Sequence, residues 1–74
     1  NPIVNIEYEL SEPSLIRFIF HNIKGEEIDR MNLGYRQSGL YKTMWNGENY
    51  SSGLYFVSLE SEPNILTKKI ILLK

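Results

Sequence analysis

The stretch Ile3–Leu10 reads IVNIEYEL, and its pattern decides the class of fold. Its even-numbered positions are apolar, and polar side chains lie between them. Side chains that alternate with a period of two indicate a β-strand with one buried face. Residues 11–14, which read SEPS, follow directly and predict a turn. The chain therefore opens with a half-buried strand that ends in a turn.

The same alternation continues through most of the chain. In the segment Leu40–Asn46, it places Tyr41, Thr43 and Trp45 on one face, and we expect Trp45 to fill the core. Several short strands separated by turns favour a small, all-β, immunoglobulin-like antiparallel β-sandwich of six to seven strands, formed by residues 1–74 as a single domain. Further strands are predicted over residues 15–21, 26–31, 53–60 and 65–73, turns over 22–25, 46–49 and 61–64, and a polar connection over 32–39.

The composition excludes several classes of protein. The chain has 74 residues, no cysteine, one histidine and a formal charge of −1. It can therefore hold neither a disulfide nor a thiolate zinc site, and it lacks the basic charge expected of a nucleic-acid-binding protein. The longest apolar run, residues 70–73, is too short to span a membrane. We expect no cofactor, no metal, no nucleic-acid partner and no membrane span.

Catalysis has little support in the sequence. His21 is the single imidazole, and alternation places it on the face opposite Phe18 and Phe20. The acidic pairs Glu7/Glu9 and Glu60/Glu62 are spaced by two, so each pair lies on the polar face of a strand rather than across a cleft. We therefore expect no enzyme activity.

Two groups of residues are candidate binding surfaces. Tyr35 and Tyr50 lie in predicted connections, where their rings could form a platform for sugars. The outward faces of the predicted strands also carry more large apolar residues than an isolated domain should expose. Either loops cover them or the domain docks on another protein, and the sequence leaves both readings open. The outward residues in question are Leu15, Ile19, Leu54, Phe56, Ile71 and Leu73.

Five segments in chain order resemble one bacterial protein family. They cover nearly the whole chain, although each motif alone is weak. Together they resemble the C-terminal sorting domain of type IX secretion and the similar immunoglobulin-like domain of the flagellar hook-capping protein. The segments are residues 1–13 (NPIVNIEYELSEP), 22–28 (NIKGEEI), 39–47 (GLYKTMWNG), 52–56 (SGLYF) and 68–74 (KKIILLK).

The resemblance implies a non-catalytic tail on a larger secreted protein. Its expected partners are a cargo domain N-terminal to it in the same chain, the outer-membrane secretion translocon and a cell-surface sortase. The expected location is the outer cell surface or the medium, reached through the periplasm. Asn1-Pro2 reads as a start inside a longer protein. The family's conserved features, which are candidates for the sorting signal, fall on Gly39, Tyr41, Gly53, Tyr55, Lys68, Lys69 and Lys74.

Two departures and two alternatives accompany this resemblance. Asn22 stands where the family usually has aspartate, and residues 35–38 replace a segment of small residues. The lysines near the C-terminus either protect an edge strand from unwanted pairing or are read by a receptor.

The alternative function is an accessory β-sandwich, carbohydrate-binding or stabilising, of an extracellular glycoside hydrolase or protease, with polysaccharide as its partner.

Overall fold

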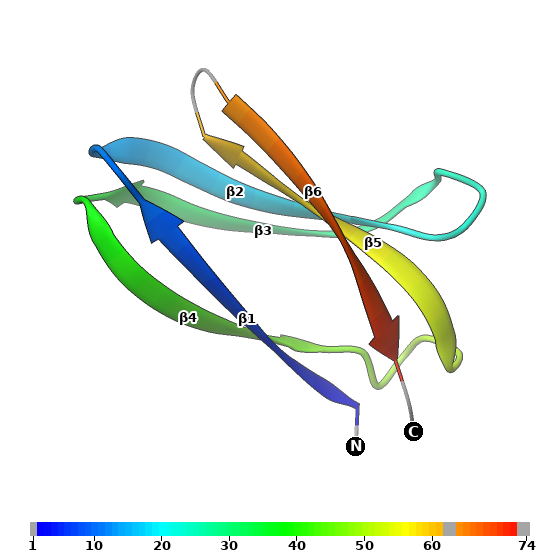
Figure 1. The fold of residues 1–74 in the computed structure, drawn as a ribbon. Helices are drawn as coiled ribbons and strands as arrows, with labels where there is room; N and C mark the ends of the chain where they lie inside the picture. Colours follow the sequence, from blue (N-terminus) through cyan, green and yellow to red (C-terminus); the bar gives the residue numbers. More distant parts are fainter. Residues whose placement is uncertain (1, 62–63, 73–74) are drawn as a thin grey trace.

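The computed structural model describes residues 2–61 and 64–72, and the side chains of residues 2–61, 71 and 72. Over these residues the chain forms strands and turns without a helix, and so without one that could span a membrane. The strands stack in two layers, which confirms the predicted β-sandwich (Figure 1). The strands are β1 (Ile3–Leu10), β2 (Ser14–His21), β3 (Glu27–Arg36), β4 (Gly39–Asn46), β5 (Gly53–Ser61) and β6 (Asn64–Leu72).

The two layers differ in width. One sheet has two strands in the order β1-β4, the other has four in the order β3-β2-β5-β6, and every pair is antiparallel. The start of β1 and the end of β6 lie at the same end of the sandwich (Figure 1). The accessible surface of 5085 Å² exceeds the roughly 4,700 Å² expected for this mass. Two strands cannot cover four completely, so the sandwich is partly open.

The third strand is longer than the sequence predicted. The prediction ended it at Met31 and assigned residues 32–39 to a connection, whereas β3 continues to Arg36. The error has a physical cause, because the pairing of β2 with β3 shifts register twice, between Ile16 and Arg17 and between Phe20 and His21. Each shift adds an unpaired residue to the strand, and such β-bulges break the period-two alternation.

The core is built around Trp45 of β4, as the sequence predicted. Its side chain is 2% exposed. The indole stacks on Phe20 with ring centroids 4.4 Å apart, and on Tyr50 at 5.4 Å, while Tyr55 meets it edge-on at 5.9 Å. Residues from β2, β4, β5 and the loop between β4 and β5 thus meet at one side chain, which joins the two sheets.

Asp29 of β3 completes the surroundings of this tryptophan. The indole Nε1 donates a hydrogen bond to Asp29 Oδ2 at 2.8 Å, across the two sheets. Asp29 is the register partner of Phe20, directly before the register shift, and so shares the inner face with that apolar residue. Beside it, the Tyr50 hydroxyl donates to the Ile28 carbonyl at 2.9 Å. The polar atom of the buried indole is therefore satisfied, as burial requires.

Gly47 closes the end of the sandwich where β1 starts and β6 ends. Its backbone N–H donates to the Pro2 carbonyl at 2.8 Å, and Leu72 of β6 covers its Cα. A Cβ at this position would lie 2.7 Å from Leu72 Cδ1. Leu72 is fully buried and has little room to retreat, so the glycine is required by space.

We predict that Gly47→Ala destabilises the domain by about 1–3 kcal/mol, the usual cost of overpacking a core. Urea unfolding of the 74-residue chain measures this free energy. The control is a double-mutant cycle with Leu72→Ala, because removing the leucine should make the alanine at position 47 much less costly. An equal cost in both backgrounds would show that steric conflict with Leu72 is not the cause.

Candidate functional site

The family-like residues Gly39 and Tyr41 form a hydrogen-bonded strand entry at the start of β4. Gly39 has a φ of +149°, which side chains of other residues rarely allow. Two residues later, the Tyr41 hydroxyl turns back and donates to the Gln37 carbonyl at 2.7 Å. The tyrosine therefore fastens the turn between β3 and β4 to the strand that leaves it.

Gly53 and Tyr55 repeat this arrangement at the start of β5. Gly53 has a φ of +157°, and the Tyr55 hydroxyl donates to the Ser51 carbonyl at 2.6 Å. In both places the acceptor lies four residues before the tyrosine, as in the tyrosine corner of immunoglobulin-like sandwiches. The sequence indicated two strand entries, and the structure adds that they share one hydrogen-bonding device.

We predict that Tyr55→Phe destabilises the domain by about 1–2 kcal/mol and Tyr41→Phe by less, because the Tyr55 bond is partly buried and the Tyr41 bond is exposed. Chemical denaturation gives both values. The matched control is Tyr35→Phe, since the Tyr35 side chain is 62% exposed and should tolerate the loss of its hydroxyl. An unchanged stability for Tyr55→Phe would contradict the structural role of the corner.

Asn22 organises the hairpin between β2 and β3. Its Oδ1 accepts hydrogen bonds from the backbone N–H groups of Lys24 and Glu26, at 2.9 and 3.0 Å. Gly25 supplies the positive φ that the turn needs, as predicted. An aspartate could accept the same two bonds, but Asn22 Nδ2 also donates to the Glu26 carboxylate at 2.8 Å. The departure from the family pattern therefore suits the neighbouring glutamate.

The lysines of the resemblance lie on or beyond the last strand. Within β6, Lys68 is in register with Val57 and Lys69 with Phe56. β6 is the edge strand of the wider sheet, as predicted for the last strand. Lys74 lies outside the described residues. The choice between edge protection and recognition by a receptor stays open.

Three of the residues predicted to face outward are exposed on the wider sheet. Leu15 is 62% exposed, Leu54 40% and Ile71 65%. Leu54 and Ile71 are cross-strand partners on β5 and β6, so they form one apolar pair. Leu15 pairs instead with Tyr35 at the far edge, where β2 meets β3. The exposed apolar residues thus form separate pairs rather than one patch.

None of the other three residues predicted to face outward is shown to be exposed. Phe56 is half-buried, and Leu73 lies outside the described residues. Ile19 is only 6% exposed, so the prediction that it contributes an exposed side chain was wrong. It lies on the central strand β2 with Arg30 and Ser58 as its register neighbours. Long side chains on such neighbours cover apolar surface with their methylene groups.

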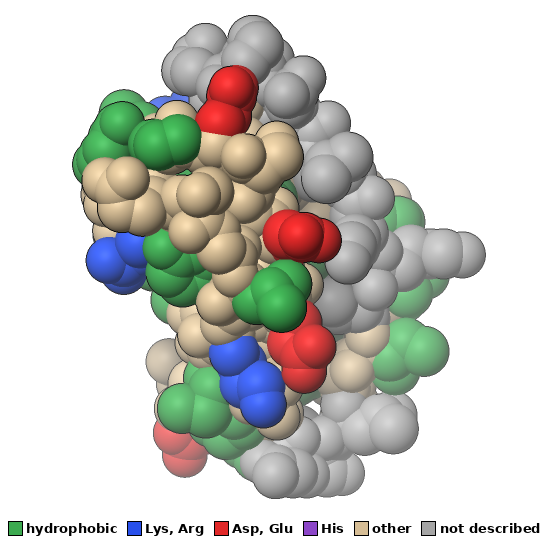
Figure 2. All heavy atoms as spheres, turned by 60° about the vertical axis from the view of Figure 1, so that its left-hand side comes forward, with side chains coloured by type: hydrophobic (Ala, Val, Ile, Leu, Met, Phe, Trp, Pro, Cys, Tyr) green, Lys and Arg blue, Asp and Glu red, His purple; other side chains and the backbone are tan. Residues whose placement is uncertain are grey.

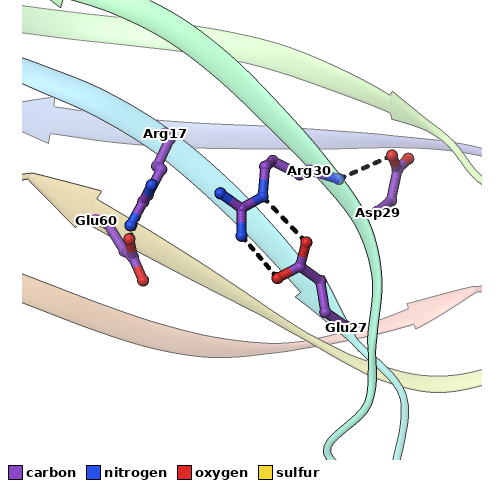
Figure 3. A network of polar contacts seen from close by, with 5 residues as sticks. All are labelled: Arg17, Glu27, Asp29, Arg30 and Glu60. Atoms are coloured by element: carbon purple, nitrogen blue, oxygen red, sulfur yellow. Dashed lines mark hydrogen bonds and ion pairs between the residues drawn. The ribbon is translucent and has the colours of Figure 1, made fainter.

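Ion pairs lie on the wider sheet, and Figure 3 shows Arg17 with Glu60 and Arg30 with Glu27; Arg30 is the register partner of Ile19. Arg17 pairs with Glu60 across β2 and β5. Arg30 donates two hydrogen bonds to the Glu27 carboxylate, from Nε at 3.0 Å and from Nη2 at 2.9 Å. The Arg30 bond lowers the pKa of Glu27 below 4.5, so any stabilisation from this pair is lost as the pH falls through that lowered value. Both groups are exposed, which makes the contribution small.

The two tyrosines proposed as a sugar platform lie apart. Tyr35 is exposed on β3 beside Leu15. Tyr50 instead packs one ring face on Trp45, and burial, followed by the charge of Asp29, raises the pKa of its hydroxyl. No observation brings Tyr35 and Tyr50 together, and the sugar platform stays a prediction.

The narrower sheet carries an apolar surface that was not singled out from the sequence. Leu40 is 81% exposed and Met44 63%, on the face of β4 opposite Trp45. The alternation of Leu40–Asn46 already placed Leu40 and Met44 on the face opposite Trp45, so the sequence contained the signal for this surface. Figure 2 shows that on the face it draws, hydrophobic side chains lie scattered among charged ones.

The described residues contain no group of three or more histidine, aspartate or glutamate side chains that could hold a metal ion. His21 is half-buried at the end of β2, in register with Glu27 and Phe56. The site is therefore one of backbone turns, tyrosine corners and exposed apolar pairs. This fold defines a small antiparallel β-sandwich whose strand entries are held by tyrosine hydrogen bonds.

Comparison with known proteins identifies the family. The family model described as the secretion system C-terminal sorting domain matches residues 1–73, so the chain belongs to this family. No curated protein and no solved structure matches significantly. The membership confirms the predicted resemblance and the expected location, export through the periplasm to the cell surface or the extracellular space. A sorting domain of this family also implies a cargo protein that the type IX machinery handles.

Proposed function

We propose that this domain is the non-catalytic tail that directs a larger extracellular protein through type IX secretion to the cell surface, where a sortase processes the exported cargo. The match of the sorting-domain family to residues 1–73 carries this proposal. The structure supports it, because the motif residues Tyr41 and Tyr55 fasten the strand entries of a folded sandwich.

The sorting signal, in this proposal, is the folded surface rather than each motif residue in turn. Gly39, Tyr41, Gly53 and Tyr55 act by forming the strand entries of β4 and β5. In this proposal the machinery reads the C-terminal lysines together with the exposed docking pair Leu54–Ile71 on β5 and β6. This pair is the part of the predicted docking face that is both exposed and contiguous.

Export of a reporter enzyme fused to the domain tests the proposal in a bacterium that has type IX secretion. The intact fusion should reach the medium or cell surface, whereas a fusion without the domain should stay active in the periplasm. Leu54→Ser with Ile71→Ser should reduce export several-fold. The matched control is Leu40→Ser with Met44→Ser, which removes two exposed apolar side chains, 81% and 63% exposed, from the other sheet. Normal export of the truncated reporter would contradict the sorting function, and equal export of both double variants would contradict the docking pair.

The accessory alternative has weaker support. A carbohydrate platform needs an exposed aromatic face, and Tyr35 provides one, but Tyr50 and Trp45 pack against each other. Retention of the domain on insoluble polysaccharides, compared with Tyr35→Ala, distinguishes this function from sorting.

A further inference from the structure

The narrower sheet leaves one edge of β1 open along residues 6–9. β1 pairs with β4 on one side, and no described strand pairs with its other side. In Figure 1 that side faces β6, which belongs to the other layer. An unpaired edge presents a row of backbone N–H and C=O groups that can bind another strand. The open edge is therefore a possible docking site for extended peptide, and its side chains decide which peptide fits.

An apolar groove lies along this edge. It has a volume of about 190 Å³ and is lined by residues 6–9 of β1, Phe18 of β2, and Val57 and Leu59 of β5. Phe18 and Val57 are buried at its floor, while Tyr8 and Leu59 are half-buried. The groove lies between the layers because the two-stranded sheet does not cover the wider sheet. It offers room for apolar side chains on the inner face of one more strand.

The outer face of the same edge is acidic. Glu7 and Glu9 alternate with the apolar residues of β1, and both are exposed at the rim of the groove that they help to line. Lys42 lies 4.0 Å from Glu7, and Glu9 has no ion pair with a described residue. A strand added beside β1 would place its inner side chains next to Ile6 and Tyr8, and its outer side chains next to these carboxylates.

We propose that the open edge of β1 binds an extended segment of a partner protein in which apolar residues alternate with lysine or arginine. The apolar residues enter the groove, the basic residues meet Glu7 and Glu9, and the backbones pair as neighbouring strands do. A second copy of this chain fits less well, because pairing β1 with β1 would bring the same carboxylates against each other. This binding site goes beyond the sorting function, and its test does not depend on secretion.

The test titrates the ¹⁵N-labelled chain with an acetylated and amidated seven-residue peptide that alternates valine and lysine. Binding should shift the amide resonances of residues 6–9 and slow their hydrogen exchange. The matched probes are a peptide of valine and glutamate and a valine–lysine peptide with methylated backbone nitrogens, both of which should bind more weakly. In the chain, Glu9→Lys should weaken binding of the lysine peptide at least about twofold, as expected when one cross-strand attraction becomes a repulsion.

Three results would overturn the proposal. The first is no response of residues 6–9 to millimolar lysine peptide. The second is equal binding of the glutamate peptide, which would remove the charge argument. The third is self-association of the chain, measured by sedimentation, with protection of the same residues, since a second copy would then occupy the edge. A Glu9→Lys variant that keeps the thermal midpoint of the parent chain ensures that weaker binding reflects the site and not the fold.

Discussion

The fold depends on how the indole of Trp45 is enclosed. Rings from three other parts of the chain pack against it, and Asp29 of the opposite sheet accepts its one hydrogen bond. A sandwich of 74 residues without cysteine has no covalent link to hold its two sheets together. Burying a large aromatic side chain at native packing density is then the strongest available link between the layers. The other features of the domain position the residues that surround this ring.

The motifs of the sorting-domain family fit this arrangement. The two tyrosine corners fix the starts of β4 and β5, the strands that carry Trp45 and Tyr55. Gly47 directly follows β4, and because it has no side chain, Leu72 can pack over the end of the core. Residues that look like separate short signals along the sequence thus meet in one structural unit. In the proposed sorting function, the surface to be recognised therefore forms only when this unit is complete.

Much of the fold could be predicted from alternation alone. The bounds of β1 and the inner face of β4 follow from strict period-two patterns, and each buries one face as expected. The second half of β3 could not be predicted, because the bulges in this strand break the pattern and leave no periodic signal in residues 32–36. Asp29 was missed for a related reason, since the bulge beside it breaks the alternation between Ile28 and Asp29. Ile19 was wrongly predicted to be exposed, because alternation indicates the face on which a side chain lies but not whether neighbouring side chains cover it.

Hydrogen exchange of the Trp45 indole Nε1–H tests the central role of this residue most directly. If the indole and Asp29 join the sheets, this proton exchanges only when the whole domain unfolds, and its protection equals that of the slowest backbone amides of β2 and β5. Rapid exchange of the indole proton, while those amides remain protected, would mean that the sheets hold together without this contact and would contradict the account.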